Sequence, residues 1–280
     1  MKTITKVNIA KLIFHTLIIM GFNKKRLVKR NSINWELDLS EGIDLSIFLF
    51  GHFQNEITKS IFSMIRNVRK YDKKLVSIID VGSNIGDKSL SLTKKLIDYK
   101  INNFKIFSIE PTEFAYQKQL KNLKLNSSLK KKIDLYKLFI SNKKKRKKST
   151  YSSWKLNDDN FSHKIHKGYL KQIKKTTKIV TLDNFIKKNK IEDTIILKID
   201  VDGFEMNVLK SCVQSLKKKK VIIFMEFAPY ALKENGSNER EFYSFVKKHN
   251  LNILNLNFEE LKTIQINEGS SKDIILMQKN

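Results

Sequence analysis

An acidic residue and two glycines stand close together where an apolar run ends, in the sequence IIDVGSNIGDK. The acid is Asp80, and Gly82 and Gly86 follow it four residues apart. The pattern lacks the second glycine of the dinucleotide-binding fingerprint, and it does not match the phosphate-binding loop. A carboxylate at this turn repels a pyrophosphate but attracts a ligand that carries an amine or a sulfonium. The turn therefore predicts a site for a cationic ligand.

A second acid, Glu110, ends the next apolar run. A carboxylate at the end of a second strand can accept hydrogen bonds from the hydroxyls of a ribose. Together with the glycine turn it indicates a ligand that contains adenosine, and S-adenosylmethionine fits best. The alternative is that the glycines only permit a tight turn. The residues predicted to hold the cofactor are Asp80, Gly82, Asn84, Gly86, Glu110 and Pro111.

A further group of acids follows two later apolar runs. Asp200 ends the run TIILKID, and a charge at a buried strand end is costly unless it has a purpose. Asp202 and Glu205 can line the same pocket, or they can cap a helix and offset its dipole. Asp183 belongs to the same predicted pocket wall. We expect no metal, although Mg²⁺ or Mn²⁺ bridged by these acids is an open alternative.

Alternating apolar runs and amphipathic segments predict the elements that position these turns. Such alternation implies βαβ units and a mainly parallel sheet, with ligands at the carboxyl ends of its strands. Thr112 is available to cap a helix. The predicted strands include residues 75–81, 104–111, 132–141, 220–227, 251–256 and 273–277, and the predicted helices include residues 88–98, 112–126 and 239–249.

Two regions depart from this alternation. Residues 33–58 predict short strands and turns that lead into a helix over 56–68. Residues 142–175 are polar and basic with interspersed aromatic residues, which predicts a loop and one helix over the active edge of the sheet.

The net charge of +27 raises nucleic acid and anionic membranes as partners. Because most of the basic residues are Lys rather than Arg, the better bidentate phosphate ligand, we do not expect nucleic acid. The apolar segment 12–22 is too short to span a bilayer. It predicts a helix that packs on the domain or lies on an anionic membrane surface. The single cysteine, Cys212, excludes an intramolecular disulfide and suits the cytoplasm, including the inner membrane surface.

Four segments in order resemble the FkbM family of S-adenosylmethionine-dependent methyltransferases: DVGSNIGDKSLSL, SIEPTEFAYQKQLKNLKLN, VTLDNF and LKIDVDGFEMNVLK. Asp202 stands where the family pattern usually has Glu. The resemblance covers residues 51–227 and implies an α/β class I methyltransferase (Rossmann-like) fold, a mostly parallel seven-stranded sheet with helices on both faces. An N-terminal extension, 1–70, would precede the methyltransferase domain, 71–280, with its insertion at 142–175.

The resemblance also implies methyl transfer to a hydroxyl of a saccharide, glycan or natural product, in which positioning supplies much of the rate. Asp200 is predicted as the general base, with Glu226 in reserve. His163 and His166 are alternatives in the insertion. Glu56 joins the predicted pocket because GHFQNE resembles a further family segment.

Two other functions remain open. An RNA methyltransferase would use the basic residues 143–148 and Trp154 as a surface for charge and stacking. A non-catalytic protein would keep the fold and bind a membrane or a polymer through its basic surface.

Overall fold

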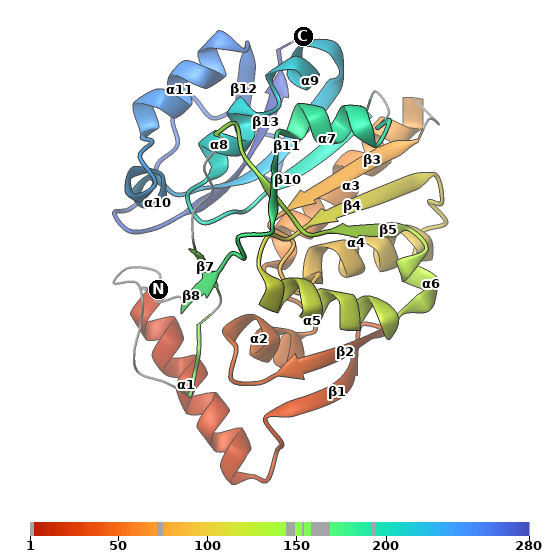
Figure 1. Ribbon diagram of the computed structural model, residues 1–280, viewed down its shortest axis with the longest axis vertical. Helices are drawn as coiled ribbons and strands as arrows, with labels where there is room; N and C mark the ends of the chain where they lie inside the picture. Colours follow the sequence, from red (N-terminus) through yellow and green to blue (C-terminus); the bar gives the residue numbers. More distant parts are fainter. Residues whose placement is uncertain are drawn as a thin grey trace.

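The computed structural model describes residues 3–71, 75–143, 149–152, 154–157, 169–191 and 194–279. A seven-stranded sheet lies at its centre (Figure 1), in the order β12-β13-β11-β10-β3-β4-β5. β13 is antiparallel to both of its neighbours, and the pairs from β11 to β5 are parallel. The strands are β3 (Val76–Val81), β4 (Phe104–Ile109), β5 (Ile133–Tyr136), β10 (Thr194–Ile199), β11 (Lys220–Phe227), β12 (Leu251–Leu254) and β13 (Lys272–Gln278).

The strand order reverses between β3 and β10. From β3 the chain continues outward to β4 and β5, whereas from β10 it continues in the other direction to β11. All six residues of β3 and of β10 are buried, as expected for central strands covered on both faces. The carboxyl ends of these two strands therefore form the switch point, where open α/β sheets bind ligands.

Helices cover both faces of the sheet, and alternate strand residues contribute to the two core clusters. In β3, Val76 and Ile78 belong to one cluster and Ile79 and Val81 to the other. The predicted cap is confirmed, since Thr112 accepts a hydrogen bond from the backbone N–H of Ala115. The helices that follow β3 are α4 (Asp87–Asp98), α5 (Glu113–Lys124), α6 (Ser127–Lys130), α7 (Leu182–Lys188), α8 (Glu205–Lys210), α9 (Val213–Lys218), α10 (Pro229–Glu234) and α11 (Glu239–Lys248).

The N-terminal segment shares a core cluster with the sheet. Trp35 is fully buried and belongs to the same cluster as Ile78 and Ile196. Figure 1 shows the first part of this segment, residues 3–50, below the sheet on the side of α5. Among the described residues no helix is long and apolar enough to cross a membrane. The elements of the N-terminal segment are α1 (Thr3–Ile19), β1 (Lys25–Arg30), β2 (Ile33–Asp38), α2 (Gly42–Phe50) and α3 (Asn55–Tyr71).

Two expectations about secondary structure were wrong. The segment GIDLSIFLF forms α2 rather than strands and turns, because Leu45, Ile47 and Phe48 lie on one buried face, and tertiary burial outweighs their strand propensity. Residues 132–141 form two strands rather than one. The second, β6 (Leu138–Ile140), leaves the central sheet and pairs with β9 (Lys178–Val180).

Two short strands of the insertion pair with each other. β7 (Ser149–Ser152) pairs antiparallel with β8 (Tyr169–Gln172). The backbone N–H groups of Gly42 and Leu156 bond to Trp154 and Ser40, which ties the insertion to the start of α2. The expected helix, most of the basic run 143–148, and His163 and His166 lie outside the described residues.

Two asparagine side chains of the α5 region satisfy the free edge of β2. Asn126 accepts from the N–H of Asn34 at 2.9 Å and donates to its carbonyl at 2.7 Å. Asn122 accepts from the N–H of Glu36 at 2.9 Å and donates to the carbonyl of Ile85 at 3.2 Å. These amides take the place of a partner strand, and they attach the N-terminal segment to the sheet domain.

We expect Asn126→Ala to lower the free energy of unfolding by about 1–3 kcal/mol, because it leaves the N–H and the carbonyl of Asn34 without their partner. Urea denaturation measures the change. Asn102→Ala is the matched control, since the side chain of Asn102 is exposed. Equal losses in the two variants would contradict this account of the attachment.

Candidate active site

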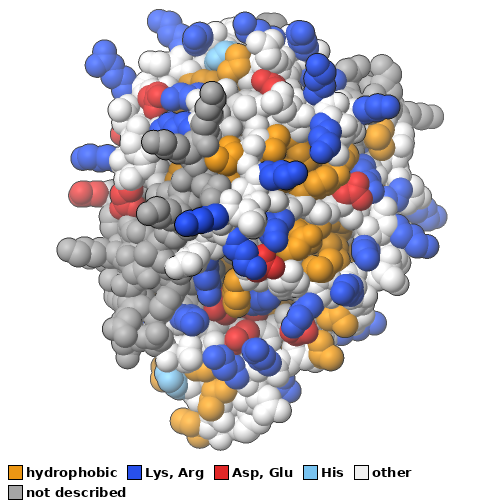
Figure 2. Space-filling view, in the orientation of Figure 1, with side chains coloured by type: hydrophobic (Ala, Val, Ile, Leu, Met, Phe, Trp, Pro, Cys, Tyr) orange, Lys and Arg blue, Asp and Glu red, His pale blue; other side chains and the backbone are white. Residues whose placement is uncertain are grey.

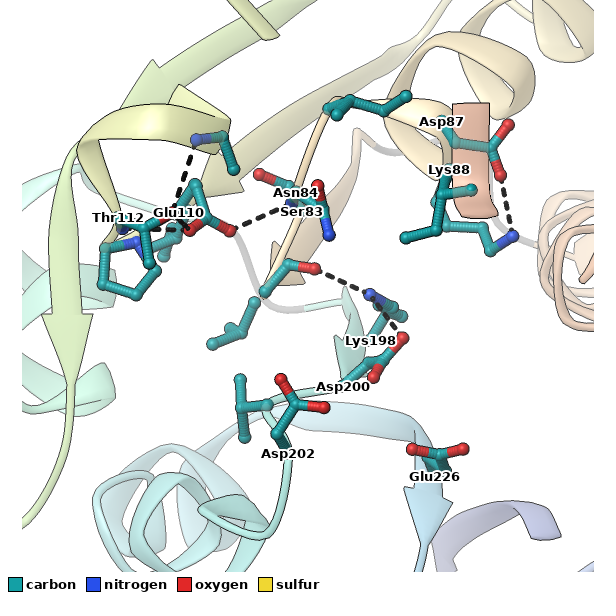
Figure 3. A pocket seen from close by; sticks show the side chains of 18 of the residues that line it. Ser83, Asn84, Asp87, Lys88, Glu110, Thr112, Lys198, Asp200, Asp202 and Glu226 are labelled. Carbon is teal, nitrogen blue, oxygen red and sulfur yellow. Dashed lines mark hydrogen bonds and ion pairs between the residues drawn. The ribbon is translucent and has the colours of Figure 1, made fainter. Parts of the chain in front are cut away.

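A cavity of about 260 Å³ opens at the switch point of the sheet. The turn after β3, the end of β4 and the ends of β10 and β11 form its walls (Figure 3). The N-terminal segment and the insertion also contribute, through Phe53, Gln54 and Trp154. Of the residues predicted from the sequence, the cavity brings together Gly82, Asn84, Glu110, Pro111, Asp200, Asp202 and Glu226.

Glu110 connects the turn after β3 with the start of α5. Its Oε2 accepts a hydrogen bond from the N–H of Asn84 at 3.0 Å. Its Oε1 accepts from the N–H and the hydroxyl of Thr112 at 2.9 and 2.6 Å. Burial raises the pKa of Glu110, and these hydrogen bonds oppose the rise. The carboxylate is thus fixed in place at the cavity wall.

Both glycines of the turn make room for protein atoms. Gly82 has φ +82°, and a Cβ there would lie 1.9 Å from the carbonyl oxygen of Asp200. Gly86 has φ +87°, and a Cβ there would lie 2.8 Å from the side chain of Gln119. Gly82 therefore allows the turn after β3 to pack directly on the end of β10. Gly86 is the N-cap residue of α4 and does not line the cavity.

Lys198 joins the two acids that end the central strands. It lies beside Asp80 in the register of β10 and β3. Its ammonium is 3.2 Å from Oδ1 of Asp80 and 3.4 Å from Oδ2 of Asp200, and it donates to the carbonyl of Gly82 at 3.1 Å. Asp80 also accepts from the hydroxyl of Ser89 at 2.7 Å. Figure 3 shows Lys198 between the glycine turn and Asp200.

The electrostatics of this group favour a charged lysine. Burial alone would lower the pKa of Lys198, but the neighbouring carboxylates of Asp80 and Asp200 raise it well above its ordinary value. Asp80 is almost fully covered and does not line the cavity, whereas the side chain of Asp200 is 34% exposed. The buried carboxylate of Asp80 thus neutralises the ammonium of Lys198. The carboxylate of Asp200 brings negative charge to the cavity wall.

Our sequence-based reasoning did not identify Lys198 as a site residue. The available signal was a single lysine inside the otherwise apolar run TIILKI, where burial of an unpaired ammonium would be costly. It also missed Phe53, Gln54 and Tyr230, which the fold brings to the cavity from distant parts of the chain.

The wall opposite Glu110 is acidic. Burial raises the pKa of Asp202 well above its ordinary value, and the charges of Asp200 and Glu205 raise it further. Burial and the charge of Asp200 do the same for Glu226, whose Oε1 accepts from the hydroxyl of Ser271 at 2.6 Å. These shifts favour the protonated form of the two carboxyls, which can then donate hydrogen bonds.

Three other predicted pocket acids lie outside the cavity. Asp183 accepts hydrogen bonds from the N–H groups of Gln214 and Ser215, at the start of α9. Glu205 is buried behind the wall, where it accepts from the N–H groups of Val201 and Gly203. Its pKa rises to about 7, chiefly through burial.

The third of these acids, Glu56, is exposed on α3 and pairs with Lys59 at 2.8 Å. Among the described residues no group of three His, Cys, Asp or Glu side chains is placed to hold a metal ion.

We expect Lys198→Met to lower the free energy of unfolding by about 3–5 kcal/mol, because it leaves Asp80 buried without its cation. Urea denaturation measures the loss, and Asp80→Asn in the same chain should restore part of it. Lys105→Met is the control, since its pair with Asp134 is partly exposed to solvent and contributes about 0–1 kcal/mol. A loss no larger than that of the control would show that the buried pair does not stabilise the fold.

Comparison with solved structures finds matches to several methyltransferases, each at low sequence identity and with a TM-score below 0.5. FkbM methyltransferase from Methylobacillus flagellatus is 13% identical, with a TM-score of 0.42, and the match covers 73% of this chain but only 44% of that one. A TehB-like methyltransferase from Corynebacterium glutamicum is 8% identical, with a TM-score of 0.41 and coverage of 84% and 94%. Magnesium protoporphyrin IX methyltransferase from Synechocystis, with bound S-adenosylmethionine, is 8% identical, with a TM-score of 0.43 and coverage of 80% and 79%.

No curated protein sequence matches this chain. The model of the methyltransferase FkbM domain matches residues 80–259, which include the glycine turn, Glu110, Lys198 and the acidic wall. The matched family and the seven-stranded, mostly parallel sheet agree with the class I methyltransferase fold. The chain therefore belongs to the FkbM family of methyltransferases.

Proposed function

We propose that this protein is an S-adenosylmethionine-dependent O-methyltransferase whose acceptor is a hydroxyl of a saccharide, a glycan or a natural product. The observation that carries the proposal is the composition of the cavity. Glu110 stands beside the glycine turn on one side, and Asp200, Asp202 and Glu226 stand on the other. The side with Glu110 suits a nucleoside cofactor, and the side with the three acids suits a hydroxylated acceptor.

The side chains around Glu110 fit an adenosine group. An ionised carboxylate offers about four acceptor positions, and the N–H of Asn84 and the two donors of Thr112 use three of them. One position is left for a ribose hydroxyl. Ile109 and Pro111 adjoin Glu110 in the cavity wall and give an adenine ring an apolar surface. Asp80 acts on the site through Lys198, which holds the carbonyl of Gly82.

The acidic wall fits a neutral acceptor with several hydroxyl groups. Asp202 and Glu226, with raised pKa values, can donate hydrogen bonds, and the carboxylate of Asp200 can accept them. A sugar presents donors and acceptors in this mixed arrangement. An RNA acceptor would bring phosphate groups toward the carboxylate of Asp200, and this repulsion disfavours the RNA alternative.

The cofactor, when bound, supplies an activated methyl group. The residues of this chain orient the acceptor oxygen and receive its proton, and Asp200 is the best placed to do so. Its carboxylate lines the cavity, and Nζ of Lys198 holds it in place by an ion pair, 3.4 Å from Oδ2 of Asp200. A fixed base within reach of the acceptor hydroxyl contributes about 10²–10⁴-fold to such a reaction.

We expect Asp200→Asn to lower turnover at least about 10²-fold, because the amide keeps the shape but not the basicity of the carboxylate. Mass spectrometry of candidate glycans detects methyl transfer, and calorimetry checks that the affinity for S-adenosylmethionine is unchanged. Asp98→Asn is the matched control, since Asp98 lies on the surface of α4. Normal turnover by Asp200→Asn in the presence of a chelator would exclude both a base and a metal-bridging role for Asp200.

We expect Glu110→Gln to weaken the binding of S-adenosylhomocysteine at least about tenfold, because it removes a charged acceptor for the ribose. Calorimetry with this ligand and with its 2′-deoxy analogue separates ribose binding from loss of structure. The wild type should bind the analogue more weakly, and the variant should distinguish the two ligands less. Glu268→Gln, at an exposed position, is the control. Equal discrimination by the wild type and the variant would remove Glu110 from the ribose site.

A further inference from the structure

An exposed apolar and basic surface lies at the end of the molecule farthest from β12. We call it the basic tip: the last turn of α1, residues 20–24, the strand β1 and the end of α2. Figure 1 shows α1 and β1 at this lower end, and orange side chains lie among blue ones there in Figure 2. The large apolar side chains that protrude are Ile19 (86% exposed), Met20 (67%), Leu27 (69%) and Phe50 (66%).

Side-chain contacts hold the elements of the basic tip together. Phe22, just after α1, packs edge to face on Phe48 of α2, with ring centroids 6.0 Å apart. The guanidinium of Arg26 lies over the ring of Phe22 at 4.4 Å, and Nε of Arg30 donates to the carbonyl of Phe48 at 2.6 Å. These contacts hold α1, β1 and α2 together, so the protruding side chains share one supported end of the fold.

Positive charge predominates in this region, although Glu36 and Asp38 of β2 lie opposite Leu27 and Lys25 of β1. Residues 1–35 contain eight Lys and Arg residues and no Asp or Glu. Lys24, Lys25 and Lys29 are exposed beside the apolar side chains, and Leu27 lies between the last two on the outer face of β1. A second copy of this chain would bring the same positive charge to such an interface, and like charges disfavour that contact.

We propose that the basic tip docks this protein on a bilayer that contains anionic lipids. Ile19, Met20 and Leu27 insert into the boundary between head groups and acyl chains, and the neighbouring lysines contact lipid phosphates. A lipid surface is the partner that takes up apolar side chains and also neutralises positive charge. The protein lies on such a membrane as a peripheral protein. The docking is independent of the transfer reaction, because these residues do not line the cavity.

The test is co-sedimentation of the full chain with lipid vesicles. One vesicle contains phosphatidylcholine only, and the other contains phosphatidylcholine and phosphatidylglycerol. We expect binding to the anionic vesicles at low salt and its loss in about 1 M salt, where the Debye length falls to about 3 Å. Each lysine near an anionic surface contributes about fivefold, so Lys24→Gln, Lys25→Gln and Lys29→Gln together should weaken binding about 10²-fold.

Matched variants separate the basic tip from the general positive charge of the protein. Lys217→Gln, Lys218→Gln and Lys248→Gln remove the same charge from exposed positions at the opposite end and should have less than about a threefold effect. Ile19→Ser with Met20→Ser should weaken binding at least about tenfold, because two side chains no longer enter the bilayer. Tyr99→Ser with Leu125→Ser, at exposed positions elsewhere, is the apolar control.

Three outcomes would overturn the proposal. They are equal binding to the two kinds of vesicle, equal losses in the tip variants and their controls, and a dimer in analytical ultracentrifugation that Ile19→Ser with Met20→Ser dissociates while no vesicle binding occurs. Unfolding midpoints of all variants establish that the changes leave the fold intact.

Discussion

The pairing of Lys198 with Asp80 and Asp200 is the interaction on which the site depends. Two neighbouring parallel strands place a lysine and an aspartate side by side in the middle of a buried sheet. Burial of either charge without the other would cost free energy of folding. Lys198 also holds the glycine turn in place, because it donates a hydrogen bond to the carbonyl of Gly82. The glycine turn and the carboxylate of Asp200 are therefore linked by one ammonium group.

The N-terminal segment completes this site as well as the core. Its residues line the cavity at Gly42, Phe53 and Gln54, and its strand β2 shares a core cluster with the sheet. The insertion is tied to the same segment by the bond from the N–H of Gly42 to the carbonyl of Trp154. The switch point supplies the charged groups of the cavity, and these two additions supply the aromatic side chains of Phe53 and Trp154.

Much of the fold and part of the site could be predicted from local patterns. Asp200, Glu110 and Glu226 each follow or end an apolar run, and such positions meet at one edge of a parallel sheet. Asp183 has the same residue type and a similar local pattern, yet it caps α9 through contacts with residues about thirty positions later. Sequence cannot separate these roles, because the difference lies in tertiary contacts.

The same limit explains why the sequence did not predict the helix α2 or the position of Phe53 in the cavity wall. The residues of α2 have strand propensities that burial against α1 and β2 overrides. The segment GHFQNE indicates a pocket only by resemblance, and no local pattern in it shows that Phe53 rather than Glu56 reaches the cavity. Lys198 is the exception, because a lone lysine in a central apolar strand requires a partner wherever that strand lies. The structure supplies the partner in Asp80.

The asparagine amides that cover the free edge of β2 have a consequence for aggregation. An exposed strand edge offers unpaired N–H and carbonyl groups to any other chain, and it is a common starting point for intermolecular sheets. Asn122 and Asn126 occupy the inner edge of β2, and β1 occupies the other. The outer strand β1 carries Lys and Arg at four of its six positions, and such charges discourage pairing. The two strands β1 and β2 are thus protected from such pairing at both edges, by hydrogen bonds to Asn122 and Asn126 at one edge and by charge repulsion at the other.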